Sequence, residues 1–174
     1  MSLKLRPEQN HAFSEKVYAI SKLMIQNETI VEKYIIKAAQ EAITKAEKAI
    51  KDAAYGIDTD EHALAIDVAN KVIKRAKEQD EELEKLRAEM EEKADHKLLS
   101  YFGGKIGIDE YEKKVIDRCR DYGEELLDML SDVDGGALAD KLVAGNPILR
   151  KYKEDITDQE FLDSLLAWGL KKGT

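Results

Sequence analysis

Apolar residues recur at helical spacing along almost the whole chain. The clearest stretch runs from Ile30 to Ala54, where Ile36, Ile43 and Ile50 stand seven residues apart and rows of alanine follow the same period. A seven-residue repeat of this kind predicts a helix that packs along one face, as in a coiled coil. The predicted packing or interface face, called the Ile/Ala face below, comprises Ile35, Ile36, Ala39, Ala42, Ile43, Ala46, Ala49, Ile50 and Ala53.

The same periodicity continues toward the N-terminus and predicts a long first helix over residues 8–55. It is interrupted only at residues 26–29, where Thr29 with Glu32 three residues later matches a capping box. Two readings stay open: one unbroken helix, or a helix that breaks at this polar run. Gly56 is expected to end the helix as a left-handed residue just past its last turn.

Further along the chain, the pattern predicts one more long helix and three shorter ones. The predicted ranges are 59–102, 109–131, 137–144 and 157–171. The first of these is about 66 Å long at the usual rise per residue, which is longer than an ordinary globular helix. We therefore predict an all-α fold in a single domain (1–174), an elongated helical bundle. Two long antiparallel, coiled-coil-like helices form its base, with a third helix packed alongside and short C-terminal helices.

The point at which the chain folds back determines which residues of two neighbouring helices face each other. If the third helix returns antiparallel around residue 105, Val115 to Leu130 face residues 81–96. The wide Ile/Ala face needs one further layer, because small side chains let another helix approach closely. That layer is either the chain's own C-terminal helices or a second copy of the chain.

Composition supports a helical protein and excludes several functional classes. Charged residues make up 37% of the chain and aromatic residues 6%, and no stretch shows the alternation of a β-strand. The net charge is −8 with acids and bases interleaved, so we expect no nucleic-acid partner. No apolar run is long enough for a membrane span, and a single cysteine, Cys119, fits a reducing, cytoplasmic location.

One short motif carries candidate chemistry. Glu125-Leu126-Leu127-Asp128 resembles the Glu-x-x-Asp half of the magnesium site of the all-α NTP pyrophosphohydrolases, which pair it with a Glu-x-x-Glu on the neighbouring helix. The resemblance covers only these residues; it implies Mg²⁺ as a cofactor, for which carboxylate oxygens are suitable ligands. Folding about residue 105 brings Glu84 and Glu89 toward residues 122–127. In a chain with 36 acidic residues, however, this spacing arises readily by chance.

These observations lead to two functional hypotheses. The first is a non-enzymatic helical interaction or scaffold protein without a cofactor, acting as a homodimer or with another protein partner. The alternative is a magnesium-dependent nucleotide pyrophosphohydrolase that uses the helix-borne carboxylates.

Overall fold

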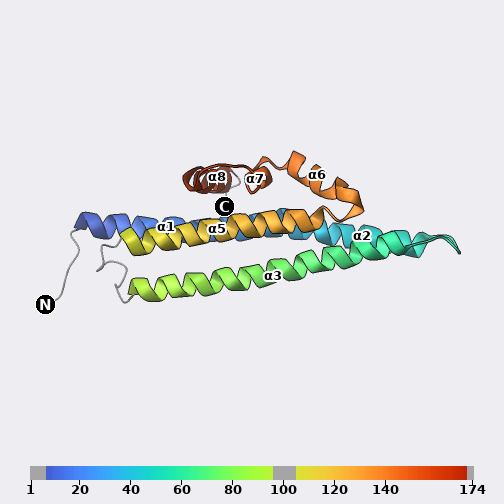
Figure 1. Cartoon of the computed structure of the whole chain (residues 1–174), viewed down its shortest axis with the longest axis horizontal. Coiled ribbons are helices and arrows are strands. Elements are labelled where there is room, and N and C mark those ends of the chain that lie inside the picture. The colour runs from blue at the N-terminus through green and yellow to red at the C-terminus, as the bar shows by residue number, and fades with distance from the viewer. Residues whose placement is uncertain (1–6, 96–104, 172–174) are drawn as a thin grey trace. The chain divides into compact units, whose positions relative to one another are not determined.

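The computed structural model describes residues 7–95 and 105–171, and every regular element in them is a helix (Figure 1). No strand occurs in these residues, which confirms the predicted all-α bundle. In chain order the elements are α1 (Pro7–Ile30), a π-helical turn (Val31–Ile36), α2 (Lys37–Asp52), α3 (Asp60–Asp95), α5 (Lys105–Leu130), a 3₁₀ turn (Asp134–Gly136), α6 (Ala137–Gly145), α7 (Pro147–Arg150) and α8 (Asp158–Lys171). The last residues of the predicted 59–102 helix lie outside the described ranges.

The chain divides into two compact units, each assembled from segments that are distant in the sequence. Unit 1 comprises residues 1–27, 80–119 and 156–174, and unit 2 comprises residues 28–79 and 120–155. Because the boundaries fall inside α1, α3 and α5, each of these helices contributes one part to each unit.

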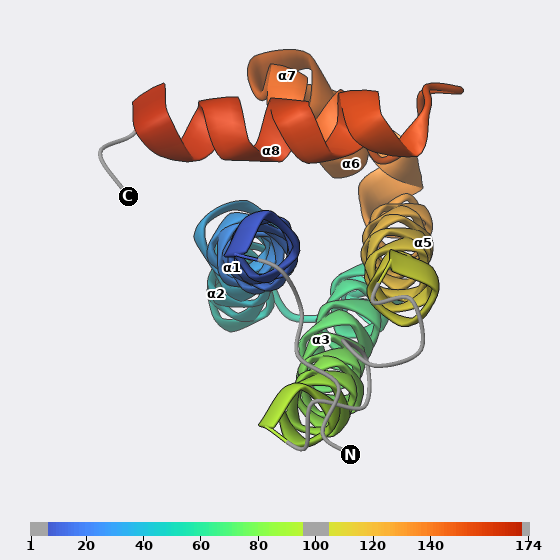
Figure 2. The same cartoon turned by 90° about the vertical axis from the view of Figure 1, so that its left-hand side faces the viewer.

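In unit 1, α8 lies across α1 and α5 (Figure 2). Its end approaches α1 so closely that a Cβ atom added to Gly169 would lie 2.8 Å from Oε1 of Gln26. Its start is held to α5 by an ion pair of 3.6 Å between Asp158 and Lys113. The apolar face of α8 is thereby buried through Phe161, Leu162, Leu165 and Trp168. A short helix gains most of its stability from such docking.

Unit 2 contains the α2–α3 hairpin, the second part of α5, and then α6, α7 and the residues up to 155. The ring of Tyr152, which is 1% exposed, lies directly on the backbone of α5 at Gly123. A Cβ atom at Gly123 would lie 2.7 Å from Cγ of Tyr152, well inside van der Waals contact. A glycine is therefore required at this position for the ring to reach the helix backbone.

The first long helix does not break at residues 26–29. Gln26 and Asn27 are buried within the helix, and Ile30 keeps helical dihedral angles of φ −63° and ψ −46°. The irregularity follows at Val31–Ile36, where the backbone forms a π-helical turn. A capping box at Thr29 needs a non-helical residue there, so it does not form.

The connection between α2 and α3 differs from the predicted one. The helix ends at Asp52, and Ala53 is already extended with ψ 137°. Gly56 has φ 86° and lies inside a turn that closes when the N–H of Ile57 donates to the carbonyl of Ala54 at 3.1 Å. The predicted capping role of Gly56 was wrong, because the chain leaves the helix before reaching it. A glycine with positive φ in the third position is typical of a type II turn.

The predicted register between α3 and α5 was also wrong. In unit 2, Glu125 accepts hydrogen bonds from Arg75 and Gln79, whereas folding about residue 105 places it opposite residue 86. The observed contacts lie about two to three helical turns nearer the N-terminus of α3. Helix α5 begins at Lys105 instead of 109, and this difference of four residues accounts for part of the shift.

Candidate interaction surface

The Ile/Ala face is only partly covered within unit 2. Ile35, Ala39 and Ala46 are buried. The other members are half-buried: Ile36, Ala42, Ile43, Ala49, Ile50 and Ala53. No position beyond Ala46 on this face is buried, so its coverage decreases toward the end of α2.

The end of the α2–α3 hairpin exposes large apolar side chains. We call residues 43–67 the hairpin tip; they comprise the end of α2, the turn and the start of α3. Within it, Tyr55 is 106% exposed, Ile57 62% and Leu64 58%. Exposed apolar side chains that gather in one region mark an interaction surface more often than single ones do.

The tip is open because the third helix of unit 2 ends before reaching it. Arg75 of α3 pairs with Glu125 of α5, and α5 ends five residues later at Leu130. Five residues correspond to about 7.5 Å of helix. In an antiparallel pair, α5 therefore stops beside residues near 70 of α3. Figure 1 shows the hairpin continuing past the ends of both α5 and α6.

Sequence reasoning identified the Ile/Ala face but missed the two exposed residues Ile57 and Leu64. A signal was present, because Tyr55 and Ile57 flank Gly56 in a connection that is usually made of small polar residues. Leu64 also departs from the buried α3 row, which continues through Ala69, Val72 and Ala76.

The two arms of the hairpin tip carry different charges. The α2 arm (43–53) holds the exposed lysines Lys45, Lys48 and Lys51 together with two acids. The α3 arm (57–67) holds four acids and neither lysine nor arginine. Among these described residues, no ion pair joins a lysine of the α2 arm to an acid of the α3 arm, although all of them belong to unit 2. The three lysines and the four acids are exposed to solvent, and of the acids Asp67 pairs with Lys71 at 3.0 Å.

The carboxylate of Glu125, predicted as a magnesium ligand in the alternative reading, has protein partners. Arg75 Nε donates to its two oxygens at 3.1 and 2.9 Å, and Gln79 Nε2 donates at 2.7 Å. The guanidinium of Arg75 also lies 5.7 Å from the centre of the Tyr122 ring. These contacts tie α3 to α5 and already neutralise the charge that a metal ion would otherwise neutralise.

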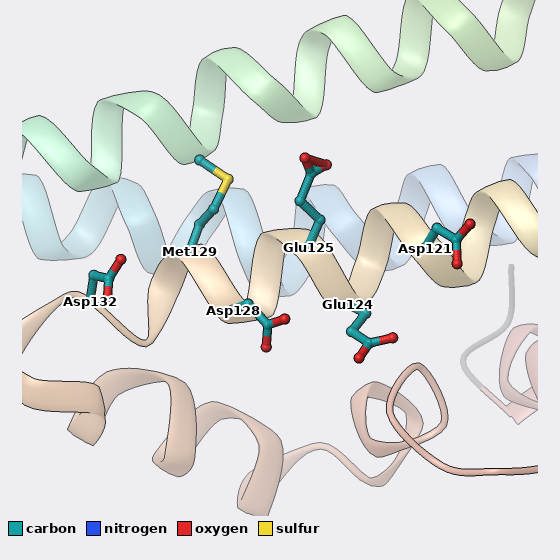
Figure 3. Close-up of a pocket in the computed structure, with 6 residues that line it drawn as sticks. All are labelled: Asp121, Glu124, Glu125, Asp128, Met129 and Asp132. Carbon is teal, nitrogen blue, oxygen red and sulfur yellow. The ribbon is translucent and has the colours of Figure 1, made fainter.

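Asp128 points away from Glu125. Figure 3 shows Glu125 and Met129 extending toward α3, whereas Glu124 and Asp128 extend to the other side of α5. The depression they line is open, has a volume of about 450 Å³, and is bordered by Asp121, Glu124, Glu125, Asp128, Met129 and Asp132. Lys153 Nζ lies 3.1 Å from Asp128 Oδ1. The Glu125–Asp128 pair thus does not converge on one point.

The two remaining candidate ligands lie in unit 1. Glu84 pairs with Arg87 at 3.2 Å, and Glu89 accepts a hydrogen bond of 2.6 Å from the hydroxyl of Tyr111. The predicted approach of Glu84 and Glu89 to residues 122–127 depended on the register corrected above. Among the described residues, no group of three or more His, Cys, Asp or Glu side chains could hold a metal ion.

The single cysteine is a core residue. Cys119 is 0% exposed, and burial raises the pKa of its thiol to about 12. A thiol with such a pKa stays protonated at neutral pH, and the thiolate is the form that reacts. Nucleophilic chemistry at Cys119 is therefore not supported.

The chain was compared with family models, curated proteins and solved structures. No family model, curated protein or solved structure matches the chain. None of the described helices is both long enough and apolar enough to cross a membrane.

Proposed function

We propose that the protein is a non-enzymatic helical interaction or scaffold protein that forms a homodimer. The observation that carries this proposal is the exposure of Tyr55, Ile57 and Leu64 on a hairpin tip that α5 does not reach. A protein partner other than a second copy is the alternative use of the same surface.

Burial of this surface provides a physical driving force. Full burial of one large apolar side chain stabilises a complex by about 1.5–3 kcal/mol before the costs of association are subtracted. The half-buried Ile43 and Ile50 can add further contact area when a partner helix covers the face. Beyond the end of α5, the ends of α2 and α3 in unit 2 are stabilised mainly by packing on each other. A further helix packed on this pair would therefore stabilise it.

Sedimentation velocity of the full chain over a wide range of concentrations tests the proposal. We expect a concentration-dependent dimer, and we expect Tyr55→Ser to shift it toward the monomer. Tyr18→Ser is the control for the loss of an exposed tyrosine, because Tyr18 is also exposed (69%) but lies on α1 in unit 1. A wild-type chain that stays monomeric at every concentration contradicts the homodimer.

The magnesium-dependent nucleotide pyrophosphohydrolase remains the second candidate. The acid-lined depression around Glu125 and Asp128 is the observation in its favour. The pairing of these residues with Arg75 and Lys153 makes it the weaker proposal. Turnover of nucleoside triphosphates in the presence of Mg²⁺ that is lost in Glu125→Gln and Asp128→Asn supports it, and absence of turnover across a nucleotide panel rejects it.

A further inference from the structure

We infer that the hairpin tip of one chain pairs with the hairpin tip of a second copy, so that the α2 arm of each lies against the α3 arm of the other. This inference rests on the proposed function and specifies the contact that makes the dimer. Two hairpins joined in this way form a four-helix bundle, in which each helix has a neighbour on both sides.

The apolar side chains of the tip fit such a contact. In a two-fold interface every patch meets its counterpart twice, so the surface must complement itself. The tip supplies large side chains (Tyr55, Ile57 and Leu64) and small ones (Ala49 and Ala53) on the same hairpin. Large groups of one copy can thus pack over the alanines of the other, where helix backbones approach closely.

The charges of the two arms select a second copy as the occupant. The α2 arm has a net charge of +1 from three lysines and two acids, and the α3 arm has a net charge of −4 from four acids. The two arms therefore attract each other when two copies cross, and the attraction occurs twice. A foreign partner would need both charges in the same arrangement, whereas a second copy has them already. Like arms placed together, α3 against α3, would bring eight acids into one contact.

Helix dipoles explain only part of this charge distribution. Acids at the start of α3 and Lys51 at the end of α2 also suit the partial charges of the helix ends. That effect falls off within one turn, and Lys45 lies seven residues before the last residue of α2. Asp58 has a local role as well, because its Oδ1 accepts the N–H of Asp60 at 2.9 Å. A test must therefore separate contacts between copies from effects within one chain.

A charge exchange between two full-length variants makes this separation. Variant one carries Lys45→Glu, Lys48→Glu and Lys51→Glu; variant two carries Asp60→Lys, Glu61→Lys and Asp67→Lys and keeps Asp58, so that its α3 arm becomes positively charged overall. By sedimentation equilibrium we expect each variant alone to dimerise roughly tenfold more weakly than wild type, because like charges face each other. We expect an equimolar mixture to regain wild-type affinity, since each altered arm then meets an oppositely charged one. Raising NaCl to about 1 M should weaken the wild-type dimer through screening.

Each outcome decides between the possibilities. Recovery in the mixture supports the arm-to-arm pairing, because attraction within one hairpin cannot be restored by another chain. A wild-type dimer with unchanged affinity in both variants overturns the arrangement but leaves the homodimer standing. A monomeric wild type overturns both proposals. If a variant loses its circular dichroism signal at 222 nm, the pair Tyr55→Ser and Ile57→Ser tests the same contact, and an unchanged dimer there rejects it.

Discussion

Unit 2 contains two stretches of the same helix, α3, that have similar apolar residues and different surroundings. Val72 and Ala76 are buried, whereas Leu64, two to three turns earlier, is 58% exposed. The difference comes from α5, which contacts α3 through Glu125 and ends at Leu130. Apolar side chains of a helix become core only where another helix reaches them, and elsewhere they remain a surface that a second molecule can cover.

The largest expected effect comes from replacing a leucine by alanine in the core that α5 forms with α3, compared with the same replacement at the tip. Leu126→Ala removes a side chain that is 0% exposed and should lower the free energy of unfolding by about 2–5 kcal/mol. Leu64→Ala should change it by no more than about 0.5 kcal/mol at protein concentrations where the chain is monomeric. Urea denaturation measures both. Equal losses would show that the tip is packed as tightly as the core, which would contradict the comparison.

The next effect concerns the close packing of Tyr152 on α5. Gly123→Ala should destabilise the protein by about 1–3 kcal/mol, because the added Cβ overlaps the buried ring. Gly145→Ala is the control, since nothing lies within 4 Å of a Cβ there. The cost of Gly123→Ala should shrink in a Tyr152→Ala background, as measured by a double-mutant cycle in urea. An unchanged cost would rule out the ring as its cause.

A smaller effect is expected from the polar contact that ties α3 to α5. Glu125→Gln should lower the free energy of unfolding by about 1 kcal/mol, since Glu125 is partly exposed and solvent screens its pair with Arg75. Glu124→Gln, at an exposed neighbouring position, should stay within about 0.5 kcal/mol. The difference should decrease at high salt. If Glu124→Gln proves the more damaging change, the assignment of Glu125 as the tie between the helices is wrong.

The smallest effect on stability, but the sharpest contrast in accessibility, comes from thiol labelling. At pH 8 the wild-type thiol of Cys119 should react with a thiol reagent only as the protein unfolds, because burial raises its pKa to about 12. The new thiol in Leu64→Cys should react at once in dilute solution. It should become protected as the concentration rises and the dimer forms. Rapid labelling of Cys119 in the native wild type would show that its side chain is accessible to solvent, which would contradict its burial in α5.

Several features were readable from the residues because they depend on local periodicity. The spacing of isoleucine, alanine and leucine predicted helices throughout the described chain, and the all-α fold is confirmed. The apolar row of Val115, Cys119, Tyr122, Leu126 and Leu130 was also identifiable, and all five residues are buried. Such patterns act within one helix and require no knowledge of its neighbours.

Other features depended on where a helix begins, which the sequence indicates poorly. The third helix was predicted to begin at residue 109, but α5 already begins at Lys105. The register between α3 and α5 therefore differs from the predicted one, and Glu125 contacts Arg75 and Gln79 instead of approaching Glu84 and Glu89. A candidate metal site was thereby replaced by an ion pair.

The sequence by itself determined that the chain forms long amphipathic helices with an Ile/Ala face, because helix formation and side-chain rows are set by residues three and four positions apart. Only the tertiary structure decided which part of that face is covered. Coverage of the α2–α3 hairpin by a third helix depends on where α5 contacts α3 and where it ends, and these are properties of packing between segments far apart in the chain. The same helices therefore contain a closed core around Tyr152 and an open tip around Tyr55.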